Sequence, residues 1–391
     1  MTDLEYKKLN DDSAMATYGR YDVVLADGKG AVAHDVNGKS YIDFGSGIGV
    51  NSLGYCNDGW INAVSKQLNR LSHTSNLYYN TATAKLYDAL VKHTKTSRAF
   101  LCNSGAEANE CAIKLARKYS YDKYGENCNI ILTLKNSFHG RTMQTLTATG
   151  QDVLHPDCFA PYVGGYAYCE TNIDSFKSAL NDNVCAVMME MIQGEGGVVP
   201  LDKAFVNEVC KIANERDILI IVDEVQTGIG RTGKLMCAEH FGICPDITTV
   251  AKGLGGGLPI GACLCGDKAK DVMTPGTHGS TFGGNPIVCA GAEYILDTVD
   301  NPEFLADVAR KGDIIRSRLK ECKNIISVRG IGMMVGIEVD GKAGADVAKA
   351  CLEKGLIVLT AKKLVRLLPP LNISDDELNR GLDILCETID E

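Results

Sequence analysis

The sequence predicts an α/β protein with a large domain, in which helices flank a mainly parallel sheet, and a smaller α+β domain. Between about residues 98 and 265, short apolar runs alternate with stretches of helical periodicity. This is the pattern of strands that are buried on both faces of a parallel sheet. After about residue 291, helices and strands are mixed differently, and the length of 391 residues exceeds that of an average single domain.

Five short apolar runs are expected to form strands of the large domain. Each run is followed by glycines, by polar residues or by a stretch of helical periodicity. The runs cover residues 129–134, 184–190, 218–222, 248–251 and 260–265.

The two ends of the chain are expected to form a second unit. Helical periodicity predicts helices over 310–322 and 345–354, and β-branched runs predict strands over 327–339 and 356–360. Residues 32–44 are typical of a hairpin. We therefore expect an N-terminal segment over 1–45 that packs with the small domain, a large domain over 46–290, and a small domain over 291–391.

The composition excludes several classes of partner. Forty basic against forty-nine acidic side chains give a net charge of −9, which offers no positive surface for nucleic acid or an anionic membrane. No apolar run reaches the ~18 residues of a membrane span, and the acidic N-terminus lacks a signal-peptide pattern. The sixteen cysteines are scattered, without the C-x2-C spacing of a zinc site. We expect a cytosolic protein with reduced thiols, no disulfide and no metal.

Residues 103–107, Asn-Ser-Gly-Ala-Glu, are expected to begin a long helix. Ser104 and Glu107 have the spacing of a capping box. The free amide groups of Gly105 and Ala106 would then point out of the positive end of the helix, where a phosphate can bind. On this motif alone, a plain helix cap explains the residues equally well.

The expected strand at 218–222 ends in two acids, Asp223 and Glu224. Because ligands of open α/β sheets bind at the carboxyl ends of strands, Asp223 is placed to meet a ligand. Residues 228–233 then read Gly-Ile-Gly-Arg-Thr-Gly, which suggests a nicotinamide dinucleotide site. The acids precede these glycines and none follows about 20 residues later, so a dehydrogenase is the less favoured interpretation.

Lys252 follows the expected strand at 248–251 and precedes a run of glycines. In such an apolar setting, desolvation lowers the pKa of a lysine amine, which can then attack a carbonyl and form a Schiff base. The alternative is a solvated loop lysine, which the apolar residues on both sides disfavour.

Two further segments suit an anionic, aromatic ligand. Residues 278–285 contain Ser280 and Thr281 among glycines, and residues 138–142 place Phe138 and Arg141 after a strand. A phosphate cradle, an aromatic ring, an acid at a strand end and a Schiff-base lysine are the groups that hold pyridoxal phosphate. The acid would keep the ring nitrogen of that cofactor protonated.

Five segments closely resemble the class III (ω-amino acid) aminotransferases, which have pyridoxal-phosphate fold type I. The resemblance runs from about residue 18 to residue 371 and implies the two-domain fold expected above, in a homodimer with shared active sites. Its most specific segments are residues 103–110, 138–142, 193–197, 223–233 and 251–256.

The resemblance also implies roles for individual residues toward the cofactor. Lys252 would bond covalently to the cofactor, Asp223 would pair with the ring nitrogen, and Gln226 would contact the ring hydroxyl. Phe138 would stack on the ring, and Thr281 would reach the phosphate from the other subunit. The implied cofactor-binding set also includes Ser104, Gly105, Ala106, Glu224 and Val225.

For the substrates, the resemblance implies that Arg141, Ser280 and Tyr18 bind the carboxylate of the amino donor. Arg366 matches the arginine that holds the α-carboxylate of glutamate or 2-oxoglutarate, and Glu195 matches the glutamate that pairs with it. Residues 46–54 and the compact length most resemble the group that acts on N2-acetylornithine. We therefore expect its terminal amino group to be transferred to 2-oxoglutarate, giving N-acetylglutamate 5-semialdehyde and glutamate, as in arginine biosynthesis.

Several alternatives remain open. Enzymes for ornithine, succinylornithine, N-succinyl-diaminopimelate, GABA and putrescine share these motifs. The chain also departs from the common pattern at residues 189–192, Met-Glu-Met-Ile, and at residues 54–57, Gly-Tyr-Cys-Asn. From other classes, a nicotinamide-dependent dehydrogenase, an aminomutase of the same fold and a non-catalytic binding protein are the alternatives. The last is disfavoured because Lys252 and Asp223 are both present.

Overall fold

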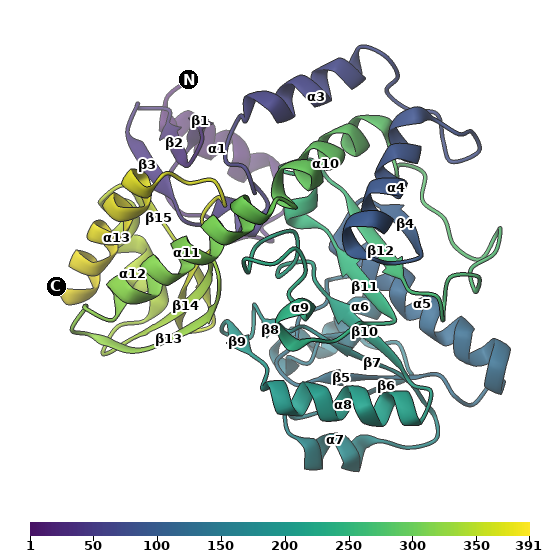
Figure 1. The fold of residues 1–391 in the computed structure, drawn as a ribbon. Coiled ribbons are helices and arrows are strands. Elements are labelled where there is room, and N and C mark those ends of the chain that lie inside the picture. Colours follow the sequence, from purple (N-terminus) through teal and green to yellow (C-terminus); the bar gives the residue numbers. More distant parts are fainter.

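A seven-stranded sheet flanked by helices forms the centre of the computed structural model, which describes residues 1–391 (Figure 1). All neighbouring strands run parallel except for the two pairs that β12 makes, so the prediction of a mainly parallel sheet is confirmed. The strands lie in the order β4 (Arg98–Cys102), β12 (Gly261–Cys265), β11 (Ile247–Val250), β10 (Leu219–Asp223), β7 (Val184–Met189), β5 (Ile130–Leu134) and β6 (Tyr166–Cys169).

The central strands of the sheet are buried because helices cover both of its faces. Every residue of β7 is buried. Met188 packs in a cluster with residues of α5 (Gly105–Tyr124), whereas Met189 packs in a cluster with residues of α8 (Lys203–Glu215). The helix α7 (Ile173–Ala179) lies beside α8. Successive side chains of one strand thus enter different cores, which explains the continuous apolar runs in the sequence.

Three helices pack together next to the β4 edge of this sheet. The apolar helix α10 (Pro286–Val299) contacts both α3 (Asp58–Leu68) and α4 (Thr81–Thr94). Figure 1 shows α10 and then α11 (Pro302–Leu319) leading from this region toward the C-terminal part of the chain.

The C-terminal part is a four-stranded antiparallel sheet covered by helices, as expected for an α+β unit. Besides α11, its helices are α12 (Gly344–Glu353), which confirms the helix predicted at 345–354, and α13 (Asp375–Asp390). In sheet order, its strands are β13 (Ile325–Ile331), β14 (Met334–Val339), β17 (Leu364–Leu367) and β16 (Leu359–Ala361).

Three predicted boundaries in this region are wrong. The single strand predicted at 327–339 is a hairpin of β13 and β14, because the chain reverses at Gly332, whose φ is 57°. The strand predicted at 356–360 is divided between β15 (Leu356–Ile357) and β16, which belong to different sheets. The helix predicted at 310–322 begins at Pro302, where the side chain of Asn301 accepts hydrogen bonds from the first turn.

The N-terminal strands form a separate sheet together with β15. The order is β1 (Leu25–Lys29), β2 (Val32–Asp35), β3 (Ser40–Asp43) and β15, and the β2–β3 pair confirms the predicted hairpin. Because β3 runs parallel to β15, hydrogen bonds join this N-terminal segment to the C-terminal part of the chain. The helix α1 (Asp3–Ser13) precedes these strands and buries none of its residues.

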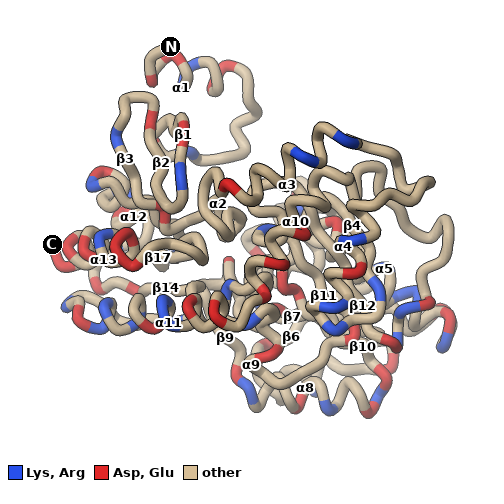
Figure 2. Tube along the Cα trace, turned by 45° about the horizontal axis from the view of Figure 1, so that its top comes forward, with Lys and Arg blue, Asp and Glu red and all other residues tan.

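Charged residues are distributed along the elements of the whole molecule. Figure 2 shows Lys and Arg interspersed with Asp and Glu rather than gathered on one element. None of the helices is both long enough and apolar enough to cross a membrane.

The remaining short elements are α2 (Ser46–Gly49), α6 (Met143–Ala148), α9 (Ala238–Phe241), the 3-10 helices η1 (Asp152–Leu154), η2 (Asp157–Phe159) and η3 (Lys252–Leu254), and the strands β8 (Ile192–Gln193) and β9 (Val199–Pro200).

Candidate active site

A cavity of about 620 Å³ lies at the carboxyl ends of the parallel strands. This is where open α/β sheets bind their ligands. The cavity unites segments that are far apart in the sequence, from the N-terminal region to the loop after η3. Of the residues predicted for the site, it is lined by Tyr18, Ser104, Gly105, Ala106, Phe138, Arg141, Asp223, Val225, Gln226 and Lys252.

The N-terminus of α5 forms part of the cavity wall. Ser104 caps the helix, with its hydroxyl oxygen accepting the N–H of Glu107 at 3.2 Å. The carboxylate of Glu107 accepts the N–H of Asn103 at 2.8 Å, so the predicted capping box is shifted by one residue on this side. A Cβ on Gly105 would lie 2.6 Å from a methyl carbon of Val225, so a larger side chain would displace the helix end or this valine. The first amide groups of α5 are therefore available to an anion.

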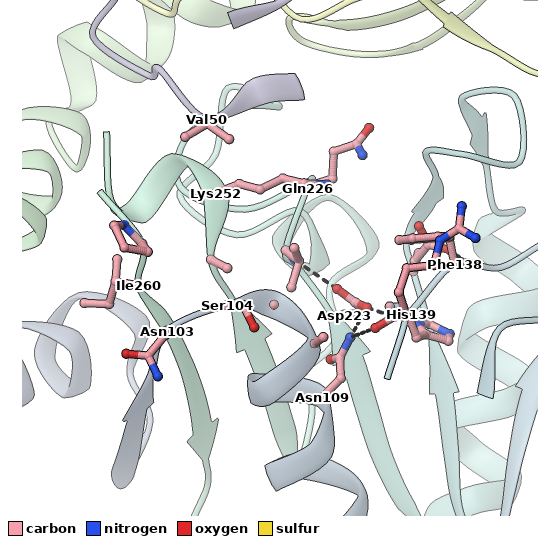
Figure 3. A pocket seen from close by; sticks show the side chains of 18 of the residues that line it. Val50, Asn103, Ser104, Asn109, Phe138, His139, Asp223, Gln226, Lys252 and Ile260 are labelled. Atoms are coloured by element: carbon pink, nitrogen blue, oxygen red, sulfur yellow. Dashed lines mark hydrogen bonds and ion pairs between the residues drawn. The ribbon is translucent and has the colours of Figure 1, made fainter. Parts of the chain in front are cut away.

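Asp223 is held in place by three hydrogen bonds at the end of β10. Its Oδ2 accepts from His139 Nδ1 at 2.8 Å and from Asn109 Nδ2 at 2.8 Å, and its Oδ1 accepts from the N–H of Val225 at 3.0 Å (Figure 3). Thr249 in turn donates to Asn109 Oδ1 at 2.7 Å, which fixes the orientation of that amide. The carboxylate is only 4% exposed, so this buried acid has a single, well-defined position.

Sequence reasoning did not assign site roles to Asn109 and His139. His139 was part of the motif at 138–142, and its side chain is fully buried behind Asp223. Asn109 lies one helical turn after Gly105 and faces the same cavity. When the N-terminus of a helix faces a ligand, the side chain one turn later lies on the same face of the helix. The four-residue spacing between Gly105 and Asn109 was therefore the signal available in the sequence.

Glu190 is a third buried residue of the cavity wall that the sequence analysis did not assign. Its carboxylate accepts the N–H groups of Phe138 at 2.9 Å and of Gly194 at 3.3 Å. Burial raises the pKa of this carboxyl to about 7. Glu190 thereby ties the segment that carries Phe138 to the segment that carries Glu195.

Phe138 and Arg141 lie next to each other at the cavity. The guanidinium of Arg141 is 5.5 Å from the ring centroid of Phe138, a cation–π distance, and Arg141 itself is exposed. A charged group in this position can meet an anionic substrate as it enters.

Lys252 is the only lysine that lines the cavity, and its amine makes no hydrogen bond or ion pair with the protein. Its side chain extends toward Gln226 (Figure 3). The backbone of Lys252 has a φ of 41°, a strained conformation that is common at functional sites. Desolvation lowers the pKa of this amine, while Glu195 has the opposite, smaller effect. An unpaired amine with a lowered pKa is suited to act as a nucleophile.

Arg366 and Glu195 form the ion pair that the resemblance implied. Arg366 Nη1 donates to Glu195 Oε1 at 2.5 Å and to Gln226 Oε1 at 3.2 Å, and its Nε has no partner. The guanidinium side chain is 3% exposed and the Glu195 side chain 31%, so Glu195 is the partner that solvent can reach. Gln226, which was expected at a cofactor hydroxyl, joins this pair to the cavity.

Besides Glu195 and Arg366, three predicted site residues lie outside the lining of the cavity. The carboxylate of Glu224 turns away and accepts from Thr227 and from the N–H groups of residues 237 and 238, so it shapes the following loop instead. Ser280 accepts from Asn103 Nδ2 at 3.1 Å, beside the cavity. Thr281 is exposed, which leaves it accessible to a neighbouring molecule.

Residues 228–233 do not begin a helix after their glycines. They form successive turns, and α9 starts only at Ala238. A dinucleotide-binding loop needs its glycines to lead directly into a helix whose N-terminus meets the pyrophosphate. The geometry of this loop therefore opposes the dehydrogenase interpretation.

Comparison with known proteins identifies the family of this chain. Residues 15–389 match the family described as aminotransferase class-III. The chain is 47% identical over 394 residues to the acetylornithine aminotransferase of Haemophilus ducreyi, with 100% of both chains covered. It is 42% identical over 392 residues to the succinylornithine transaminase of Salmonella paratyphi A, covering 97% of this chain and 96% of that protein.

Solved structures show the same fold. The ornithine aminotransferase of Toxoplasma gondii superimposes with a TM-score of 0.95 at 31% identity, covering 99% of this chain and 94% of that chain. The N-acetylornithine aminotransferase of Stenotrophomonas maltophilia superimposes with a TM-score of 0.84 at 34% identity, covering 98% of each. This chain belongs to the class III aminotransferases.

Proposed function

We propose that the protein transfers the terminal amino group of N2-acetylornithine to 2-oxoglutarate, with pyridoxal phosphate as cofactor, giving N-acetylglutamate 5-semialdehyde and glutamate, as in arginine biosynthesis. The observation that carries the proposal is the arrangement of Lys252 and Asp223 in one cavity, next to the Arg366–Glu195 pair. The similarity to acetylornithine aminotransferases over the full chain supports this choice of amino donor.

The residues of the cavity fit pyridoxal phosphate in three respects. The amide groups at the start of α5, beside Gly105, suit its phosphate. Asp223 is a buried carboxylate with a fixed orientation, which suits the protonated ring nitrogen. The amine of Lys252 has no protein partner, so it is free to bond to the aldehyde.

Bound pyridoxal phosphate supplies an aldehyde that takes up amino groups and a ring that withdraws electrons from the substrate carbon. Lys252 would hold the aldehyde of this cofactor. Its amine, when not bonded there, would accept and return a proton at the reacting carbon of the substrate. A lowered pKa favours this role, because a larger fraction of the amine is unprotonated and can accept the proton.

The Arg366–Glu195 pair allows one cavity to take two unlike substrates. While Glu195 neutralises Arg366, this arginine does not attract the carboxylate of acetylornithine. If Arg366 bound that carboxylate, the acylated nitrogen rather than the terminal amine would lie at the cofactor. The α-carboxylate of glutamate or 2-oxoglutarate displaces Glu195, and Arg366 then binds this carboxylate. Arg141, at the exposed side of the cavity, holds the carboxylate that is remote from the reacting carbon in both half-reactions.

Removing each member of this pair is expected to have opposite effects. Arg366→Ala should leave the half-reaction with acetylornithine largely intact and weaken the half-reaction with 2-oxoglutarate by about 2 to 5 kcal/mol, the cost of losing a buried charge partner. Glu195→Ala should favour glutamate and disfavour the ω-amine of acetylornithine. Single-turnover measurements of both half-reactions on both variants test this, and equal losses in both halves would show that the pair is only structural.

The amino donor is tested by a panel of amines with 2-oxoglutarate, scored for glutamate. We expect N2-acetylornithine to give the highest kcat/KM, because the full-length relatives that are 46–47% identical to this chain are acetylornithine aminotransferases. Ornithine, N2-succinylornithine, GABA and putrescine serve as the comparison. A higher kcat/KM for succinylornithine or ornithine would replace the proposed donor while leaving the aminotransferase chemistry in place.

We also propose that the enzyme is a homodimer in which Thr281 reaches the phosphate in the neighbouring subunit. Its exposure, outside the cavity of its own chain, supports this role. A shared active site requires a large, permanent interface. Sedimentation at dilute enzyme concentration should therefore show an active dimer, whereas a fully active monomer would contradict the proposal.

A cytoplasmic location is the remaining part of the proposal. All sixteen cysteines are free thiols, and most of them lie in the interior. Such a composition suits a reducing compartment, where buried thiols act as small apolar side chains.

A further inference from the structure

The loop of residues 228–233 is packed tightly against α10, α11 and the β13–β14 turn. A Cβ on Gly230 would lie 2.4 Å from a methyl carbon of Val299, and one on Gly233 would lie 2.9 Å from Cβ of Ala309. A Cβ on Gly332, at the β13–β14 turn, would lie 2.4 Å from the backbone of Thr232. Because these glycines have no side chain, the backbone of the loop lies in direct contact with α10, α11 and the β13–β14 hairpin.

Arg231 lies at the centre of this contact and is 2% exposed. Its Nη1 donates to the carbonyl of Pro369 at 2.5 Å and to the carbonyl of Met333 at 3.3 Å, and its own carbonyl accepts the N–H of Met333 at 3.0 Å. No carboxylate pairs with it, and Nη2 has no partner. Desolvation accordingly lowers the pKa of this guanidinium to about 9.

The two carbonyls that Arg231 binds flank β17, the strand that carries Arg366, and its neighbour β14. Met333 immediately precedes β14, and Pro369 lies just after β17. Within the sheet, Arg366 on β17 is paired with Gly336 on β14. A single guanidinium therefore binds the start of β14 and the end of β17, which lie side by side at one end of this antiparallel pair, next to Arg366.

Arg366 depends on its backbone for its position. Only its Nη1 has protein partners, and one of these, Glu195, must leave when a dicarboxylate binds. The end of β17 is also held by the N–H of Leu368, which donates to Phe44 at 2.7 Å. Arg231 is the only contact among these that ties the strand end to the loop following Asp223.

We propose that Arg231 is a positioning residue for Arg366: it sets the place of the β14 and β17 strands over the cavity, and thereby the affinity for the dicarboxylate substrate. This inference rests on the proposed role of Arg366. A lysine is expected to reproduce the effect only in part, because its shorter side chain must bring one ammonium to the position of Nη1 to reach both carbonyls. The lack of a carboxylate partner leaves the guanidinium free to bind the two carbonyls.

Two probes separate dicarboxylate binding from general damage. Glutarate is a dicarboxylate without an amino or oxo group, and N-acetyl-L-norvaline is the proposed donor without its terminal amine. Their binding to the cofactor-loaded enzyme is measured by calorimetry, so the readout does not depend on turnover. In Arg231→Met, we expect the Kd of glutarate to rise by about tenfold and that of N-acetyl-L-norvaline by less than about threefold. Arg231→Lys should lie between Arg231→Met and the unaltered protein, and it decides the matter if Arg231→Met does not fold.

Arg316→Met is the matched control. Arg316 Nη1 donates to the carbonyl of Gly332 at 2.9 Å, in the same turn, but from α11. The Arg316→Met variant should leave the ratio of the Kd of glutarate to the Kd of N-acetyl-L-norvaline unchanged. Equal weakening of both probes by Arg231→Met, no weakening at all, or the same selective loss in Arg316→Met would overturn the proposal. Arg366→Ala provides the reference: if it leaves glutarate binding intact, then the proposed role of Arg366 itself is wrong, independently of Arg231.

Discussion

Lys252→Ala is expected to lose transamination by at least about 10²- to 10⁴-fold, the usual contribution of one positioned proton-transfer group. The alanine lacks the amine that moves the proton and also the covalent attachment of the cofactor. No neighbouring group can replace it, because Lys252 is the only lysine in the cavity lining. The decrease should appear in both half-reactions, since each needs the proton transfer.

Borohydride treatment of the cofactor-loaded enzyme checks the same residue without measuring turnover. Peptide mapping should then find the cofactor fixed on the peptide that contains Lys252. Lys135→Ala is the control, because Lys135 lies outside this cavity and pairs with Asp152 at 3.1 Å. That variant should retain its activity and its label. A label on any residue other than Lys252 would refute the proposed mechanism.

Asp223→Asn is expected to bind the cofactor but to lower kcat by about 10²- to 10³-fold, the range for the loss of one preorganised electrostatic contact. Asparagine keeps the shape of the side chain and loses the negative charge that holds a proton on the ring nitrogen. Both oxygens of Asp223 accept hydrogen bonds, so the new NH₂ group must face a donor, either Val225 or the His139 and Asn109 pair. This adds a structural cost to the loss of charge.

Asp246→Asn serves as the control for that cost. Asp246 also accepts a backbone N–H, that of Ile220 at 2.8 Å, but it lies at the opposite end of β10 from Asp223. It should lower the free energy of unfolding and leave kcat unchanged. If Asp223→Asn lowers stability as Asp246→Asn does but keeps near-normal turnover, Asp223 does not support the ring nitrogen.

The tertiary structure corrected the sequence interpretation where several segments meet. Glu224 follows Asp223 directly, yet its carboxylate turns to residues 237 and 238, because successive side chains beyond a strand end point in different directions. Glu190 was noted in the sequence only as part of an unusual segment, and it bridges two loops at the cavity. Both assignments depend on where a loop of another segment lies, which local sequence does not specify.

Local patterns were sufficient to predict most strands of the large sheet, the helix that Ser104 caps and the position of Lys252 after a strand, because periodicity and capping are properties of neighbouring residues. They could not predict the antiparallel direction of β12, the reversal at Gly332, or the burial of His139 and Asn109 behind Asp223. Nor could they show that Arg231 donates to the carbonyls of Met333 and Pro369, beside β14 and β17. The contacts of His139 and Asn109 with Asp223, and those of Arg231 with Met333 and Pro369, join residues that are 84 to 138 positions apart. Only the packing of the complete chain brings such groups within hydrogen-bond distance.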